Sequence, residues 1–138
     1  MDNKKVYLVQ VNVTYSKTIA YLPYAAGCLA AYAWSDEKVS SRYDLAEILC
    51  VRHKVEESFA GIENPAVVGF SCYVWNMEYN LKLAEMVKQK YPGCVIVFGG
   101  HNVPDDTSLL EKHPFIDVLM HSEGEEPFAM LLKALDGD

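Results

Sequence analysis

The sequence predicts an α/β fold in which a parallel sheet of five strands lies between two layers of helices. Two apolar runs, Val67–Phe70 and Val95–Phe98, are continuous rather than alternating, which is typical of strands buried on both faces. They end at the small residues Ser71 and Gly99, which leave little bulk at the carboxyl end of each strand. Strand-like and helix-like segments also alternate five times along the chain, an order that favours parallel strands joined by right-handed crossovers.

The first strand is expected at residues 6–13, which are apolar with some alternation. After a polar loop, residues 21–34 place apolar side chains at helical spacing and predict a helix. Pro23 is compatible with the first turn of this helix. Gly27 lies inside it, where glycine costs up to ~1 kcal/mol relative to alanine. Its presence therefore suggests close packing on the sheet or against a ligand.

The middle of the chain predicts two further strands and two helices. Residues 43–51 alternate and are more polar, which predicts a strand near an edge of the sheet. Residues 54–61 predict a short helix or turn, and residues 67–73 predict the third strand. Asn76 is a plausible N-cap for the clearest helix, at residues 77–91, because its side chain can accept a hydrogen bond from a first-turn N–H.

The last third of the chain begins with the fourth strand, at residues 95–98, followed by a glycine-rich loop and a short helix that reaches Lys112. Residues 117–120 predict the fifth strand, and a final helix is expected at residues 127–135 with Pro127 at its first position. Sheets of this kind commonly have the strand order 2-1-3-4-5. We therefore expect a flavodoxin-like, Rossmann-type three-layer sandwich that binds its ligand at the carboxyl edge of the sheet.

The composition indicates one globular domain over residues 1–138, with 51% hydrophobic and 22% charged residues. The net charge of −7 argues against nucleic acid or an anionic membrane as the main partner, since both require a basic surface. The N-terminus does not resemble a signal peptide, and no apolar run reaches the ~18 residues that a bilayer requires. We therefore expect a cytoplasmic protein.

Several kinds of site are excluded by the absence of their motifs. The four cysteines contain no C-x-x-C pair, so we expect buried, reduced thiols rather than a zinc or iron–sulfur site. The chain has no G-x-x-x-x-G-K-[ST] or G-x-G-x-x-G phosphate-binding motif and no G-x-S-x-G nucleophile motif. Asn12 and Ser71 stand where a response-regulator receiver needs acidic residues, which excludes that class.

The loops after the first, third, fourth and fifth strands meet at one edge of the predicted sheet. They are rich in small residues, hydroxyls and aromatics and poor in acid–base pairs, which favours a surface for a bulky organic ligand over a hydrolytic site. We assign no catalytic and no metal-ligating residue. The candidate ligand-binding residues are Asn12, Thr14, Tyr15, Ser16, Ser71, Tyr73, Trp75, Gly99, Gly100, His101, Glu123 and Gly124.

Three motifs in these loops carry a family resemblance. V-G-F-S at 68–71, V-F-G-G-H at 97–101 and S-E-G-E-E-P-F at 122–128 lie in register with the predicted strands. Together they resemble the N-terminal cobalamin-binding domain of radical S-adenosylmethionine (SAM) enzymes. The resemblance covers essentially the whole chain, and it implies that Ser71 and Gly99-Gly100 surround the nucleotide tail of cobalamin.

One departure from related corrinoid domains bears on the cobalt. Domains that ligate cobalt through histidine carry D-x-H-x-x-G after the first strand. This chain reads N-V-T-Y-S-K at 12–17, and its four histidines are at 53, 101, 113 and 121. The resemblance therefore implies base-off cobalamin without a histidine ligand, whose lower face meets a loop side chain or nothing.

The resemblance also implies a larger parent protein. The C-x-x-x-C-x-x-C motif that binds a [4Fe–4S] cluster in radical SAM enzymes is absent from this chain. The cluster and SAM would then belong to a barrel domain joined in cis, and this chain would be either an excised N-terminal domain or a short homologue, not catalytic alone. In the parent enzyme, cobalamin could relay a methyl group or serve as a structural or electron-transfer element, and the sequence does not choose between these roles.

Plainer interpretations of the same residues stay open. Gly99-Gly100 could form only a tight turn, and Ser71 could be a cap or turn residue. His101 could hydrogen-bond to backbone, and Tyr73 and Trp75 could pack in a core or against an absent domain. The alternative function is accordingly a cofactor-free interaction or regulatory domain of the same fold, whose bulky rim residues fill the space that a corrin ring would take.

Overall fold

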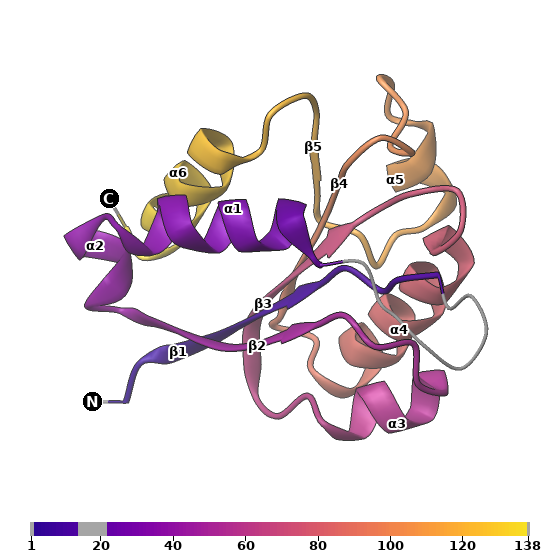
Figure 1. Cartoon of the computed structure of the whole chain (residues 1–138), viewed down its shortest axis with the longest axis horizontal. Helices are drawn as coiled ribbons and strands as arrows, with labels where there is room; N and C mark the ends of the chain where they lie inside the picture. The colour runs from indigo at the N-terminus through magenta and orange to yellow at the C-terminus, as the bar shows by residue number, and fades with distance from the viewer. Residues whose placement is uncertain (1, 14–21, 138) are drawn as a thin grey trace.

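A computed structural model describes residues 2–13 and 22–137 of the chain. Five strands form one parallel sheet in the order β2-β1-β3-β4-β5, which confirms the predicted topology (Figure 1). The strands are β1 (Lys4–Val9), β2 (Tyr43–Leu49), β3 (Pro65–Ser71), β4 (Val95–Gly99) and β5 (Val118–Met120). The helices are α1 (Tyr24–Trp34), α2 (Glu37–Ser40), α3 (Val55–Ala60), α4 (Met77–Lys90), α5 (Ser108–Lys112) and α6 (Glu125–Leu135).

Helices cover both faces of the sheet (Figure 1). α1, α2 and α6 lie on one face, where Ala33 and Leu132 pack in the same buried cluster as Val6. α3, α4 and α5 lie on the other face, where Leu83 belongs to a second buried cluster that includes Phe98. Because both faces are covered, β3 and β4 are largely buried, which accounts for their continuously apolar sequences.

The strand β2 lies at an edge of the sheet, as its polar alternation predicts, and it exposes residues in its middle. β1 ends at Val9, four residues earlier than expected. The chain nevertheless continues beside β2, because Gln10 donates its backbone N–H to the Leu49 carbonyl at 2.9 Å and Asn12 donates to the Cys50 carbonyl at 3.1 Å.

Three local details differ from the sequence predictions. The short helix α2 was not expected, and Asp36 caps it by accepting a hydrogen bond from the Lys38 N–H at 2.9 Å. α6 begins at Glu125, so Pro127 occupies its third position, where proline is tolerated because the first four N–H groups of a helix lack intrahelical partners. A Cβ added to Gly27 would meet nothing within 4 Å among the described residues, so the predicted close packing on the sheet is wrong.

The cysteines are unpaired thiols in two environments. Cys72 and Cys94 are buried, and desolvation by burial raises the pKa of each thiol to about 12. Cys28 and Cys50 are only half-buried, so the expectation of buried thiols holds for two of the four. Within residues 2–13 and 22–137, no group of three His, Cys, Asp or Glu side chains could hold a metal ion. In the same residues, every helix is too short or too polar to cross a membrane.

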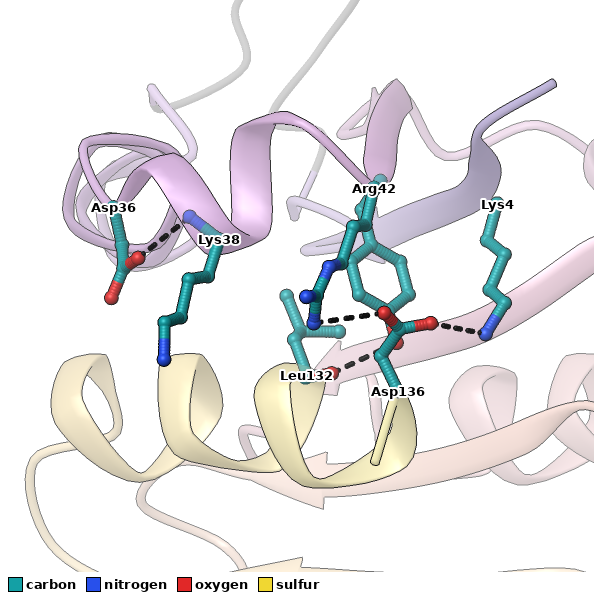
Figure 2. A network of polar contacts seen from close by, with 7 residues as sticks. Lys4, Asp36, Lys38, Arg42, Leu132 and Asp136 are labelled. Carbon is teal, nitrogen blue, oxygen red and sulfur yellow. Dashed lines mark hydrogen bonds and ion pairs between the residues drawn. The ribbon is translucent and has the colours of Figure 1, made fainter. Parts of the chain in front are cut away.

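A set of polar contacts, the amino-edge network, ties α6 to the amino edge of the sheet (Figure 2). The carboxylate of Asp136 accepts a hydrogen bond from Lys4 Nζ at 2.7 Å and pairs with Arg42 Nη1 at 2.9 Å. The Tyr43 hydroxyl, which is buried, donates to the Leu132 carbonyl at 2.8 Å. These five residues come from β1, the start of β2 and the C-terminal end of α6, so the network joins both ends of the described chain.

Candidate functional site

The register of the sheet sets two rows of residues under α1 and α6. Each row runs across neighbouring strands, and the two rows are two residues apart along β3 and β4. Alternate residues of a strand face the same side of a sheet, so both rows face these helices. The lower row includes Leu8, Gly69 and Val97 and continues to Val118 on β5, and the upper row, nearer the carboxyl edge, includes Ser71, Gly99 and Met120.

A cavity of about 190 Å³ lies between these rows and the two helices. Ala25, Ala26 and Leu29 of α1 contribute one wall, and Phe128 of α6 contributes the other. Around the lower row the lining side chains are apolar. The polar side chains of the lining all lie at or beyond the carboxyl ends of the strands, and they are Ser71, Tyr73, His101, Ser122, Glu123 and Glu125.

Gly69 allows close packing in the lower row because it has no side chain. A Cβ at this position would lie 3.0 Å from Leu8 Cδ2 and 3.6 Å from Phe128 Cε2, so these two side chains already fill the space next to it and leave no room for a larger residue. Gly99 in the upper row is less crowded, since a Cβ there would lie at an ordinary contact distance, 3.6 Å, from the Cβ of Met120. Both glycines line the cavity, and they present backbone rather than side chains to it on the sheet side.

The Gly99-Gly100 turn joins the ends of β3 and β4. Cys72 donates its N–H to the Gly99 carbonyl at 2.7 Å, and its own carbonyl accepts from the Asn102 N–H at 3.0 Å. Gly100 has a φ of +103°, and a Cβ there would lie 2.8 Å from the Cys72 carbonyl oxygen. Only glycine fits this position, so the tight-turn interpretation holds, and the same turn also lines the cavity.

The loop after β3 carries a pair of stacked aromatic rings. The rings of Tyr73 and Trp75 are parallel to within 2°, with centroids 4.6 Å apart. The His101 ring lies 5.6 Å from that of Tyr73, which connects this loop to the loop after β4. Trp75 is 48% exposed and Val74 is 83% exposed, so the loop presents apolar surface to solvent at the rim.

Two fully buried asparagines, Asn76 and Asn80, form hydrogen bonds with the backbone at the start of this loop. Asn76 accepts from the Tyr73 N–H at 2.8 Å and donates to the carbonyls of Ser71 at 2.9 Å and Val11 at 3.2 Å. Asn80 donates to the Ser71 carbonyl at 3.3 Å, whereas its own Oδ1 is buried without a partner among the described residues. Asn76 precedes α4 as expected, but its side chain does not cap the helix and instead joins the ends of β1 and β3.

The loop between β5 and α6 closes the remaining side of the cavity. Ser122 has a φ of +60°, a conformation that is uncommon for a residue with a side chain. Gly124 is the N-cap of α6, and a Cβ there would lie 3.2 Å from Leu29 Cδ2. Glu125 lies in the first turn of α6, where the helix dipole favours acidic residues.

The structure brings seven of the predicted residues to this cavity. They are Ser71, Tyr73, Gly99, Gly100, His101, Glu123 and Gly124. Asn12 is buried outside the lining, and Trp75 meets the site only through its stack on Tyr73. Thr14, Tyr15 and Ser16 lie outside the described residues.

Sequence reasoning missed the helix walls of the cavity and Gly69. Ala25, Ala26 and Leu29 indicated only an apolar helix face, and Phe128 stood only as the last residue of the S-E-G-E-E-P-F motif at 122–128. The strand pattern contained a usable signal in Gly69, because a glycine in the middle of a buried strand often marks a close approach of another group.

Comparisons with known proteins agree on one family. A family model described as a B12 binding domain matches residues 24–132. The chain is 42% identical over 130 residues to the cobalamin-dependent radical SAM methyltransferase TokK of Streptomyces tokunonensis. It is 41% identical over 132 residues to the 2-(S-pantetheinyl)-carbapenam-3-carboxylate methyltransferase of Streptantibioticus cattleyicolor. These matches cover 94% and 95% of this chain but only 18% and 19% of the relatives, so the chain spans less than a fifth of their length.

A solved structure supports the fold. A cobalamin-binding protein from Desulfitobacterium hafniense superposes with a TM-score of 0.60 over 96% of this chain and 57% of that protein. The sequence identity is 14%, so this likeness concerns the arrangement of helices and strands alone.

Proposed function

Because this chain belongs to the family of B12-binding domains, we propose that it binds cobalamin with the nucleotide tail in the cavity and the corrin ring over the carboxyl edge of the sheet. The observation that carries the proposal is the cavity itself, which the backbone of Gly69 and Gly99 lines on the sheet side and whose polar side chains gather at its mouth. A cavity of about 150 Å³ is large enough to hold benzene. The cavity of about 190 Å³ in this chain suits an aromatic base.

The polar side chains around the mouth fit the more polar parts of the tail. Ser71 would donate a hydrogen bond to the sugar–phosphate part of the nucleotide. Because the Gly99-Gly100 turn has no side chains, the sugar–phosphate part could pass close to its backbone. Ser122 and Glu123 would contact the same part from the β5–α6 loop. These roles use residues that already line one cavity, so they require no rearrangement of the strands.

The lower face of the corrin would rest on the loop after β3. The Tyr73–Trp75 pair offers a flat apolar surface beside the cavity mouth, and the N-V-T-Y-S-K sequence at 12–17 supplies no histidine from the loop after β1. We therefore expect the cofactor to be base-off, with no histidine on cobalt. The buried Asn76 amide would keep the rings in place by fixing the Tyr73 N–H.

The role in the parent protein follows from the relatives. Bound cobalamin would supply a cobalt centre that carries a methyl group, and a radical SAM barrel in the same polypeptide would hold SAM and a [4Fe–4S] cluster. Residues 1–138 would thus form the cofactor-binding domain of a cobalamin-dependent radical SAM methyltransferase, without a catalytic residue of their own. The short coverage of the relatives fits a domain of this size.

The alternative is a cofactor-free interaction domain, which the exposed rim favours. Leu22, Tyr24 and Val74 are 85%, 78% and 83% exposed, and all lie in or next to loops at the carboxyl edge. Such apolar exposure fits a surface that another domain covers. In that case the rim residues would contact protein directly, and the cavity would stay without a corrinoid.

Retention of colour after desalting tests the two possibilities. The chain is mixed with hydroxocobalamin under oxidising and reducing conditions, desalted, and examined for visible absorbance. We expect absorbance to be retained in a ratio approaching one cofactor per chain. Gly99→Val, which adds a side chain to the cavity lining at a position where a Cβ makes only ordinary contacts, should abolish retention, whereas Gly93→Val, at a position where a Cβ meets nothing within 4 Å, should not. A colourless wild-type protein under all conditions would support the alternative.

Electron paramagnetic resonance tests the lower face separately. The bound Co(II) form should lack the strong nitrogen superhyperfine pattern that an axial nitrogen produces. A strong pattern would show that a histidine or the tail base ligates cobalt, and it would refute the base-off part of the proposal while leaving cofactor binding intact.

A further inference from the structure

The polarity of the cavity changes along its depth. The upper row contains the Ser71 hydroxyl and lies beside the polar loops, whereas the lower row includes Leu8, Gly69 and Val97. The two rows are separated by two residues, which is roughly 6.6 Å along a parallel strand. A group that enters from the carboxyl edge therefore passes polar side chains first and then reaches apolar ones.

The strands around the lower row offer no free backbone groups to the cavity. β1 and β3 are paired on both sides by parallel neighbours, and β4 lies between β3 and β5, so their N–H and C=O groups are used within the sheet. On the helix side, the Ala26 N–H is already bound by Gln10 Oε1 at 2.9 Å, and this contact is buried. Over the residues that the structure describes, the sheet side of the lower cavity is therefore apolar in backbone as well as in side chains.

We propose that this cavity selects the lower base of the corrinoid, favouring an apolar base such as 5,6-dimethylbenzimidazole over a purine such as adenine. The inference rests on the proposed function, namely that the nucleotide tail enters here. A dimethylbenzimidazole ring presents only C–H groups at its far edge, and these match Leu29, Val97 and Phe128. Adenine would bring an amino group and additional ring nitrogens into a region where they leave water without gaining partners.

The expected size of the preference follows from that desolvation. A buried polar atom left without a partner weakens binding by about 5- to 150-fold. Because part of the purine edge can keep contact with the polar mouth, we expect the adenine-based corrinoid to bind roughly tenfold more weakly than cobalamin, or weaker still. The contacts of the corrin ring with the rim are the same for both compounds, so they cancel in the ratio.

Three probes separate the possible outcomes, with Kd measured on the 138-residue chain by visible absorbance. They are hydroxocobalamin, the same corrinoid with adenine as lower base, and cobinamide, which lacks the nucleotide. We expect cobalamin to bind most tightly and cobinamide most weakly. Equal Kd values for cobalamin and the adenine compound would overturn base selection but leave the proposed function standing. Cobinamide binding as tightly as cobalamin would refute tail insertion itself, and no binding of any probe would refute both.

A pair of variants ties the preference to the lower row. Val97→Thr keeps the side-chain shape and places a hydroxyl in the cavity, where it can pair with a purine, so the Kd ratio should shrink at least threefold. Val67→Thr is the matched control, because Val67 is buried in the same cluster but does not line the cavity. If both variants change the ratio equally, or neither does, the lower row is not the selecting element and the proposal fails.

Discussion

The two edges of the sheet differ in how their polar groups are used. At the amino edge, the charges of Lys4, Arg42 and Asp136 are paired with one another (Figure 2). At the carboxyl edge, the structure has a cavity, exposed aromatic rings and a glycine with positive φ. The amino edge thus joins β1, β2 and α6, whereas the carboxyl edge leaves a cavity and an apolar rim open to a ligand. We therefore expect substitutions at the amino edge to change stability alone, and substitutions at the carboxyl edge to show which residues affect ligand binding.

Gly100→Ala should have the largest effect on stability, because both backbone and packing oppose a side chain there. The φ of +103° disfavours any L-residue, and the added Cβ would lie 2.8 Å from one backbone atom of Cys72 and 2.9 Å from another. We expect a loss of about 3 kcal/mol or more in the free energy of unfolding. Urea unfolding followed by circular dichroism measures this loss. Gly93→Ala is the control, and an unchanged midpoint for Gly100→Ala would contradict the expectation.

Asn76→Ala should rank second and should also change the rim. The variant leaves the Tyr73 N–H and the Val11 carbonyl without the Asn76 partner and leaves the Ser71 carbonyl with Asn80 as its side-chain donor, which costs about 2–3 kcal/mol. The Tyr73–Trp75 stack should loosen at the same time, and this would appear as a shift in Trp75 emission in a Trp34→Phe background. Asn102→Ala, at an exposed position in the next loop, should change neither quantity. A stability loss with unaltered Trp75 emission would show that Asn76 does not position the rings.

Tyr43→Phe tests the amino edge and should have a smaller effect. It removes the buried hydroxyl that donates to the Leu132 carbonyl at 2.8 Å, with an expected loss of about 1 kcal/mol in unfolding free energy. Cobalamin affinity should not change, because the cavity lies at the other edge of the sheet. Tyr32→Phe, on an exposed side chain, serves as control. Weaker cofactor binding by Tyr43→Phe would show that the two edges are coupled.

We expect the smallest effect to be a pH dependence of the free energy of unfolding, caused by the Asp136 carboxyl group. The hydrogen bond from Lys4 lowers the pKa of this carboxyl below the ordinary value of 3.8, and the Lys133 hydrogen bond does the same for Asp36. Between the lowered folded pKa and 3.8 the unfolded chain binds more protons, so the stabilisation is complete above 3.8 and is lost as the pH falls through the folded pKa. Because both groups are partly open to solvent, the effect should be weak and should diminish with salt.

The measurement is the urea midpoint as a function of pH for Asp136→Asn and wild type. The two curves should converge as the pH falls below the folded pKa and should separate above about pH 4. Asp2→Asn, at an exposed site outside the network, is the control. Curves that stay parallel down to the lowest pH would show that the Asp136 contacts contribute no pH-dependent stability.

Much of the fold could be read from periodicity, because strand and helix patterns are local. The buried strands β3 and β4 were recognised from continuous apolar runs, and β2 was placed at an edge from its polar alternation. Helix starts were less accurate at Pro127, since the unpaired N–H groups of a first turn tolerate proline at more than one position. Asn76 likewise stood where a cap was expected, but its amide donates instead to the Val11 carbonyl, just beyond β1, and to the Ser71 carbonyl at the end of β3.

The sequence by itself determined the alternation of strands and helices, apart from α2, and the small residues at the strand ends, because periodicity and strand tips are properties of neighbouring residues. The strand order followed from that alternation only because five-stranded sheets of this class commonly share it. Only the tertiary structure decided that α1 and α6 close a cavity over Gly69, and that Asp136 reaches Lys4 across 132 residues of chain. These contacts depend on which distant segments the crossovers bring together, and a pattern of neighbouring residues does not indicate such long-range contacts. For the same reason, Ala26 and Leu29 looked like ordinary core residues until the fold placed them around the candidate site.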